Sequence, residues 1–173
     1  MRKLAAVLPM LLMLWAGAAC ADWRGDVQSA KLVGEGDFTV FGFRLYRAQL
    51  WSERTPVDYD ERFALHIVYT RGIKRERLAE TGIGEIKRLA DAPIPAETLA
   101  RWRADMMQAF VDVAPGDQLS AVNLPDKGVR FYAGDRMTGE FDDPAFARAF
   151  FGIWLDPSTR APTLRKHLLG IGE

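Results

Sequence analysis

Cysteine and histidine are scarce in this sequence. Its single cysteine is Cys20, and its two histidines, His66 and His167, lie 101 positions apart. Structural zinc sites need four closely spaced ligands, and small exported domains often depend on paired cysteines. Phosphate-binding glycine loops and nucleophile elbows are also missing. The sequence therefore predicts no metal site, no disulfide framework and no bound cofactor.

An excess of one charge is absent as well. Lys and Arg together number 23, and Asp and Glu also number 23, so the formal net charge is zero. Proteins that bind nucleic acid through its phosphates usually carry a strongly basic face. This balance predicts no nucleic-acid partner and gives no reason for net attraction to an anionic membrane.

Only one long apolar run is present, and it is N-terminal. Arg2 and Lys3 precede an apolar stretch from 4 to 19, and small residues then lead to Ala21 and the polar Asp22. This order is typical of a secretory signal peptide cleaved after Ala21. We expect a signal peptide at 1–21, a periplasmic location in a bacterium, and a soluble domain at 22–173 with no membrane span after cleavage.

Two alternatives to plain cleavage remain open. Lipidation at Cys20 is disfavoured because Gly17 occupies the place where lipoprotein signals usually carry a leucine-like residue. An uncleaved anchor is disfavoured because the apolar run is short for a span of roughly 20 residues.

Strand patterns stand on both sides of a block of helical patterns. Alternating or short apolar runs predict strands at 38–41, 43–51, 63–70, 118–124, 129–133 and 137–141. Periods of three and four predict helices at 73–89, 95–113, from Pro144 to about 154, and at 163–169. Gly82 and Gly84 allow the first of these to be two short helices. The arrangement predicts an α+β domain with an antiparallel sheet and helices packed on one side.

Four segments carry a resemblance to a known family. They are GEGDFTVFGFRLYRAQLW from Gly34, FALHIVYTRGIKRERLAE from Phe63, APGDQLSAVNLPDKGVRFY from Ala114 and DPAFARAFFGIWLDPSTRAPTLRKHLLG from Asp143. Together they resemble the chalcone isomerase-like proteins, in particular their exported bacterial branch. The resemblance implies an open-faced β-sandwich, in which a large antiparallel sheet bends over a layer of helices. A cleft between the two layers cyclises chalcones in the plant enzymes and holds fatty acids in related non-enzymatic members.

The enzymatic reaction needs a cation, normally an arginine, to hold a phenolate near an enone. In the plant enzymes this arginine precedes a glycine, and the matching glycine here is Gly42. Residues 34–41 contain no arginine, and the best register places Tyr46 where the enzymes have a threonine hydroxyl. This departure disfavours chalcone isomerase activity, unless Arg44 supplies the cation.

Six residues are candidates for contacting a ligand, although each also has a purely structural interpretation. Arg44 and Tyr46 are two positions apart on one strand and should share a face that lines the cleft. The other candidates are His66, Tyr69, Arg130 and Tyr132. For His66 a structural role, hydrogen-bonded to a neighbour, is favoured over a titrating base. The aromatic stripe on the 95–113 helix is typical of core, and the charges at 74–80 are typical of a solvated helix face.

The favoured function is non-catalytic binding of a fatty acid or similar small amphiphile in the cleft between sheet and helices. Arg44, Tyr46 or Arg130 would receive the carboxylate, because a guanidinium matches its geometry with two parallel hydrogen bonds. Two alternatives stay open: an isomerase or lyase acting on an enone-like compound, and a scaffold protein whose cleft is filled.

Overall fold

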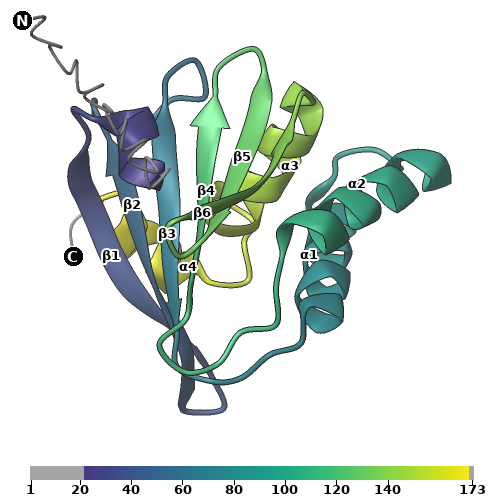
Figure 1. Cartoon of the computed structure of the whole chain (residues 1–173), viewed down its shortest axis with the longest axis horizontal. Helices are drawn as coiled ribbons and strands as arrows, with labels where there is room; N and C mark the ends of the chain where they lie inside the picture. The colour runs from purple at the N-terminus through teal and green to yellow at the C-terminus, as the bar shows by residue number, and fades with distance from the viewer. Residues whose placement is uncertain (1–21, 172–173) are drawn as a thin grey trace, which may run out of the picture.

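The computed structural model describes residues 22–171, so the signal peptide expected at 1–21 lies outside the described part. After a short 3₁₀ helix, three strands, two helices, three strands and two helices follow one another, and these later elements have the predicted order (Figure 1). The strands are β1 (Lys31–Val40), β2 (Phe43–Ser52), β3 (Phe63–Tyr69), β4 (Gln118–Leu124), β5 (Gly128–Ala133) and β6 (Arg136–Phe141). The helices are the 3₁₀ helix η1 (Trp23–Val27), α1 (Arg75–Leu89), α2 (Ala96–Ala109), α3 (Pro144–Leu155) and α4 (Pro162–Leu168).

The six strands form one sheet in the order β1-β2-β3-β4-β5-β6, and each strand is antiparallel to its neighbour. Neighbouring strands are consecutive in the chain, and only the step from β3 to β4 passes through two helices, α1 and α2. The sheet with helices confirms the α+β prediction. Two parts were not predicted: the helix η1, and the first seven residues of β1, which begins at Lys31 rather than near Phe38.

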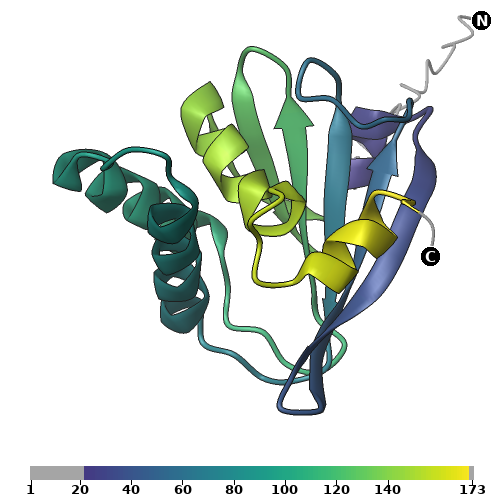
Figure 2. The same ribbon diagram turned by 180° about the vertical axis from the view of Figure 1, so that it is seen from behind.

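The two faces of the sheet are covered differently. On β3, Leu65 and Ile67 belong to the core beneath the helices, whereas the intervening His66 lies on the opposite side, as alternation along a strand requires. We call the side of Leu65 the inner face and the side of His66 the outer face. Helices α3 and α4 cover the inner face (Figure 2), and η1 lies against the outer face (Figure 1).

Two glycines in α1 do not break the helix. Gly82 lies where α1 passes α2, and a Cβ atom there would come within 3.1 Å of the Met106 sulfur. The missing side chain allows the two helices to approach closely, which offsets the low helix propensity of glycine. Helix α3 is capped by Asp143, which accepts a hydrogen bond from the Phe146 amide at 2.9 Å.

Helix α4 packs against the edge strand β1 through two further glycines. A Cβ atom on Gly34 would lie 1.8 Å from the carbonyl oxygen of His167, and one on Gly36 would lie 2.9 Å from a Leu164 methyl group. Both glycines point to α4 because they are two positions apart on the strand. The Gly-Glu-Gly sequence of β1 therefore sets how closely the last helix approaches the sheet.

Replacement of Gly34 by alanine should destabilise the fold, because the new methyl group would meet helix backbone that cannot rotate away. We expect Gly34→Ala to lower the free energy of unfolding by about 1–3 kcal/mol. Urea denaturation followed by circular dichroism measures the change. Gly84→Ala is the matched control: nothing lies within 4 Å of its Cβ position, and alanine in an exposed helix should stabilise by about 1 kcal/mol. Equal effects at both sites would contradict the close-packing explanation.

Candidate functional site

A pocket of about 700 Å³ lies between the inner face of the sheet and the helices. This is within the range of roughly 300–1,000 Å³ typical of small-molecule sites. The open volume argues against a filled cleft, and most of the lining is aliphatic or aromatic. The apolar contributors include Leu65, Ile67, Phe110, Leu119, Phe131, Phe150 and Ile153.

A β-bulge in β2 turns two consecutive side chains into the pocket. Phe38 on β1 is paired with Tyr46, but the next pair is Thr39 with Arg44, so Leu45 is an extra residue in β2. Leu45 and Tyr46 both line the pocket as a result.

The bulge also places Arg44 outside the pocket. Asp37 and Arg47 form the cross-strand pair next to Phe38 and Tyr46, so their side chains lie on the outer face. Arg44 joins them there, with its guanidinium 3.2 Å from the Asp37 carboxylate, which also binds Arg47 at 2.9 Å. The prediction that Arg44 and Tyr46 share a face is therefore wrong, because simple alternation fails at a bulge.

Tyr46 and Tyr69 place two phenol groups at the β2–β3 side of the pocket. They are cross-strand partners with ring centroids 5.8 Å apart, and the Tyr46 hydroxyl accepts a hydrogen bond from the Trp154 indole N–H at 2.9 Å. Burial raises the pKa of both phenols well above the usual value. Both therefore stay protonated at neutral pH, and the Tyr46 hydroxyl hydrogen can be donated to another acceptor.

Two arginines line the pocket, and both were missed in the sequence analysis. Arg160 is held by Glu85 at 3.1 Å, whereas none of the ion pairs within residues 22–171 involves Arg77. Arg77 lies in the first turn of α1, and Thr81 and Glu85 follow it into the lining at steps of four. The spacing of four places all three side chains on one helix face. It was missed because the neighbouring charged residues are typical of a solvated helix face.

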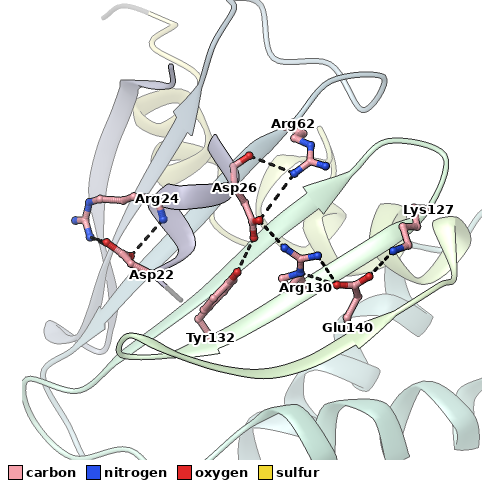
Figure 3. A network of polar contacts seen from close by, with 8 residues as sticks. All are labelled: Asp22, Arg24, Asp26, Arg62, Lys127, Arg130, Tyr132 and Glu140. Carbon is pink, nitrogen blue, oxygen red and sulfur yellow. Dashed lines mark hydrogen bonds and ion pairs between the residues drawn. The ribbon is translucent and has the colours of Figure 1, made fainter. Parts of the chain in front are cut away.

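Arg130 and Tyr132 lie on the outer face, away from the pocket. Figure 3 shows the network that holds them: Tyr132 donates to Asp26 at 2.6 Å, and Arg130 binds both Asp26 and Glu140. Burial together with the Asp26 carboxylate raises the pKa of Tyr132 to about 12. The network fastens η1 to the sheet, so the prediction that these two side chains contact a ligand in the cleft is wrong.

His66 also belongs to the outer face. Its Nδ1 lies 2.9 Å from the Ser120 hydroxyl, and its ring stacks on Trp23 with centroids 5.2 Å apart. This geometry agrees with the structural interpretation favoured from the sequence. Of the six candidates, only Tyr46 and Tyr69 reach the pocket. Among residues 22–171, no three potential metal-ligating side chains of His, Cys, Asp or Glu come together.

Comparison with known proteins identifies the family. Residues 26–170 match the family model described as chalcone isomerase-like. The chain belongs to the chalcone isomerase-like family. An uncharacterised protein of Haemophilus influenzae is 28% identical over 169 residues, a stretch that covers 97% of this chain and 78% of that protein.

A solved structure has the same chalcone isomerase-like fold. It is a fatty-acid binding protein of Arabidopsis thaliana, with a TM-score of 0.63 and 10% sequence identity, covering 82% of this chain and 87% of that one. At this identity the likeness concerns the fold alone. Together the family match and the fold confirm the resemblance and the open-faced sandwich expected from the sequence.

The buried His66 of this chalcone isomerase-like protein should make its stability depend on pH. Burial, with a smaller effect from Arg24, lowers the pKa of His66 from 6.5 to about 4. Between these values the unfolded chain binds a proton that the folded chain excludes, so stability is lost as the pH falls from 6.5 towards 4. The full loss would be about 3 kcal/mol.

Urea denaturation at several pH values measures this loss in the wild type and in His66→Gln. The wild type should lose more unfolding free energy than His66→Gln over this interval, because only it carries the buried imidazole. His167→Gln is the control, since it removes the exposed histidine and should keep the wild-type profile. Parallel profiles for the wild type and His66→Gln would count against the assignment.

Proposed function

We propose that this protein is a non-catalytic binder of a fatty acid or a similar small amphiphile. The observation that carries the proposal is the pocket of about 700 Å³, whose walls are divided between a mainly apolar surface and a few polar side chains. An amphiphile has the same division between an apolar chain and a polar head. The structural neighbour that is a fatty-acid binding protein supports the proposal through its shared fold.

The positions of the polar side chains suggest how the ligand lies. Tyr46 and Tyr69 on β2 and β3 and Arg77 on α1 provide two neutral donors and one cation for a carboxylate. The lining continues to Phe131 on β5, three strand spacings from β2. At about 4.8 Å per spacing the sheet offers a tail about 14 Å of apolar wall.

Isomerase or lyase activity on an enone-like compound is the alternative, favoured by one observation. The neutral phenols of Tyr46 and Tyr69 are able to donate hydrogen bonds to a developing enolate, and Arg77 is able to hold an anion beside them. The arginines that reach the pocket nevertheless come from α1 and the α3–α4 loop rather than from the segment before Gly42. Turnover of an enone that is lost in Tyr46→Phe would favour this alternative over the binder.

Affinity for saturated fatty acids should rise with chain length until the apolar wall is filled. Each added methylene buried in the pocket contributes about 0.8 kcal/mol, or about fourfold in affinity. Displacement of a fluorescent fatty acid from the delipidated protein measures the series.

Replacement of Arg77 by glutamine should weaken the affinity for a fatty acid by about tenfold, because a charge-assisted hydrogen bond to the carboxylate is lost. The affinity for the fatty alcohol of the same chain length should not change.

Arg75→Gln is the matched control, because Arg75 is in the same helical turn and does not line the pocket. If the two replacements lower the affinity equally, the change comes from the overall charge of the protein and not from a contact between Arg77 and the ligand. If the delipidated protein takes up no fatty acid of any length, the proposed function fails.

We also propose that the protein is exported and acts in the periplasm. The charged, apolar and small-residue segments that end at Ala21 support cleavage after that residue. The next residue, Asp22, caps η1 by accepting a hydrogen bond from the Arg24 amide, so the folded domain would begin directly after the cleavage site. We expect the periplasmic fraction of cells expressing the full chain to contain a protein whose intact mass equals residues 22–173. A membrane-bound form whose mass equals residues 20–173 with a diacylglycerol on Cys20 would show lipidation instead.

A further inference from the structure

We propose that the turn between β1 and β2 docks on a lipid surface and places the mouth of the pocket there. We call Phe41, Phe43 and Arg71 the aromatic tip. Phe41 is 96% exposed and Phe43 is 61% exposed. Large aromatic side chains are seldom so exposed without a partner. Phe41 is in the two-residue turn, and Phe43, the first residue of β2, is paired with Val40 at its base.

The backbone of this turn makes the aromatic residue costly. Phe41 has φ of 49° and Gly42 has φ of 80°, so both central residues are in the left-handed region. Turns of this kind favour asparagine followed by glycine, because a bulky side chain at positive φ is strained. A phenylalanine that is both strained and exposed contributes little to folding, which points to a role in binding.

The aromatic tip is continuous with the pocket. Thr70 donates a hydrogen bond to the Arg44 carbonyl at 2.7 Å, which ties the segment after β3 to the hairpin, and the Arg71 guanidinium lies 5.3 Å from the Phe43 ring centroid. The residues on either side of the tip, Val40 and Ile73, line the pocket. A surface that receives the tip therefore comes close to the part of the pocket that Val40 and Ile73 line.

The shape of the tip favours lipid over protein as the occupant. The β1–β2 turn projects beyond the rest of the sheet in both views (Figures 1 and 2). A stable protein interface buries about 800 Å² on each partner, far more than a two-residue turn provides. A bilayer needs no complementary shape, and aromatic rings with an adjacent arginine suit its interface of acyl chains and phosphates. Since the whole chain carries no net charge, insertion of the rings supplies the binding.

Vesicle flotation tests the docking, with protein expressed from the full chain and vesicles of phosphatidylethanolamine and phosphatidylglycerol. Phe41→Asn and Phe43→Ser should each lower partitioning onto vesicles by about tenfold, the effect of returning one aromatic side chain to water. Phe41→Asn should at the same time raise the melting temperature, because asparagine tolerates this turn. Met137→Ser is the control, since Met137 is 47% exposed on β6 and away from the tip.

Unchanged partitioning in both aromatic variants would overturn the proposal. So would an oligomer that dissociates in Phe41→Asn without any vesicle binding, because the tip would then join two copies of this chain. Docking on the lipid surface does not depend on the proposed function; only the transfer of a ligand at that surface does. Docking and fatty-acid binding can therefore be tested separately. Fatty-acid affinity in solution should be the same in Phe41→Asn as in the wild type, whereas transfer from vesicles should be slower. Vesicle binding by the tip in a protein that takes up no fatty acid would leave docking standing and remove the proposed function.

Discussion

The hydrogen bond between Trp154 and Tyr46 joins the two layers of the molecule beside the pocket. Its donor is on α3 and its acceptor on β2, and the two residues are 108 positions apart in the chain. A buried phenol without a partner costs free energy, so the bond favours one spacing between α3 and the sheet. Elsewhere α3 packs directly on the sheet through Phe146 and Phe150, which contact Phe131 on β5. The space that remains on the inner face, in front of Tyr46 and Tyr69, is the pocket.

The pocket also depends on the neighbouring edge of the sheet. Gly34 and Gly36 bring α4 against β1, and the α3–α4 loop carries Thr159 and Arg160 into the lining. Glu85 on α1 binds Arg160 at 3.1 Å, and Arg88 on the same helix donates a hydrogen bond to the Ser158 carbonyl at 3.0 Å, so both residues join α1 to this loop. The side chains that close the pocket thus come from elements far apart in the chain. Its outline is a tertiary property, even though each strand and helix has a local cause.

Much of the fold was predictable because its signals are local. Alternation in 63–70 is enough to place Leu65 and His66 on opposite faces, and consecutive strands joined by short links, as on both sides of α1 and α2, favour antiparallel pairing. The site was less predictable. The extra residue Leu45 moves the Arg44 side chain to the opposite face of the sheet, and no feature of the sequence predicts this bulge. Alternation also fails to say which face meets the helices, so Arg130 and Tyr132 were assigned to the wrong side of the sheet, where Asp26 and Glu140 hold them.

The places where local preference and observed structure disagree are informative about function. Gly34 is unfavourable in a strand, yet it is explained by the backbone of α4, which occupies the place where a Cβ atom would lie. Phe41 is unfavourable in a turn with positive φ, and no contact within the described fold explains it, since its side chain is 96% exposed. A locally unfavourable residue that packing explains has a role in stability. One that packing does not explain indicates an interaction outside the domain. Because the strands that meet at this turn also carry Phe38, Val40, Leu45 and Tyr46 into the pocket, this unexplained residue lies next to the pocket.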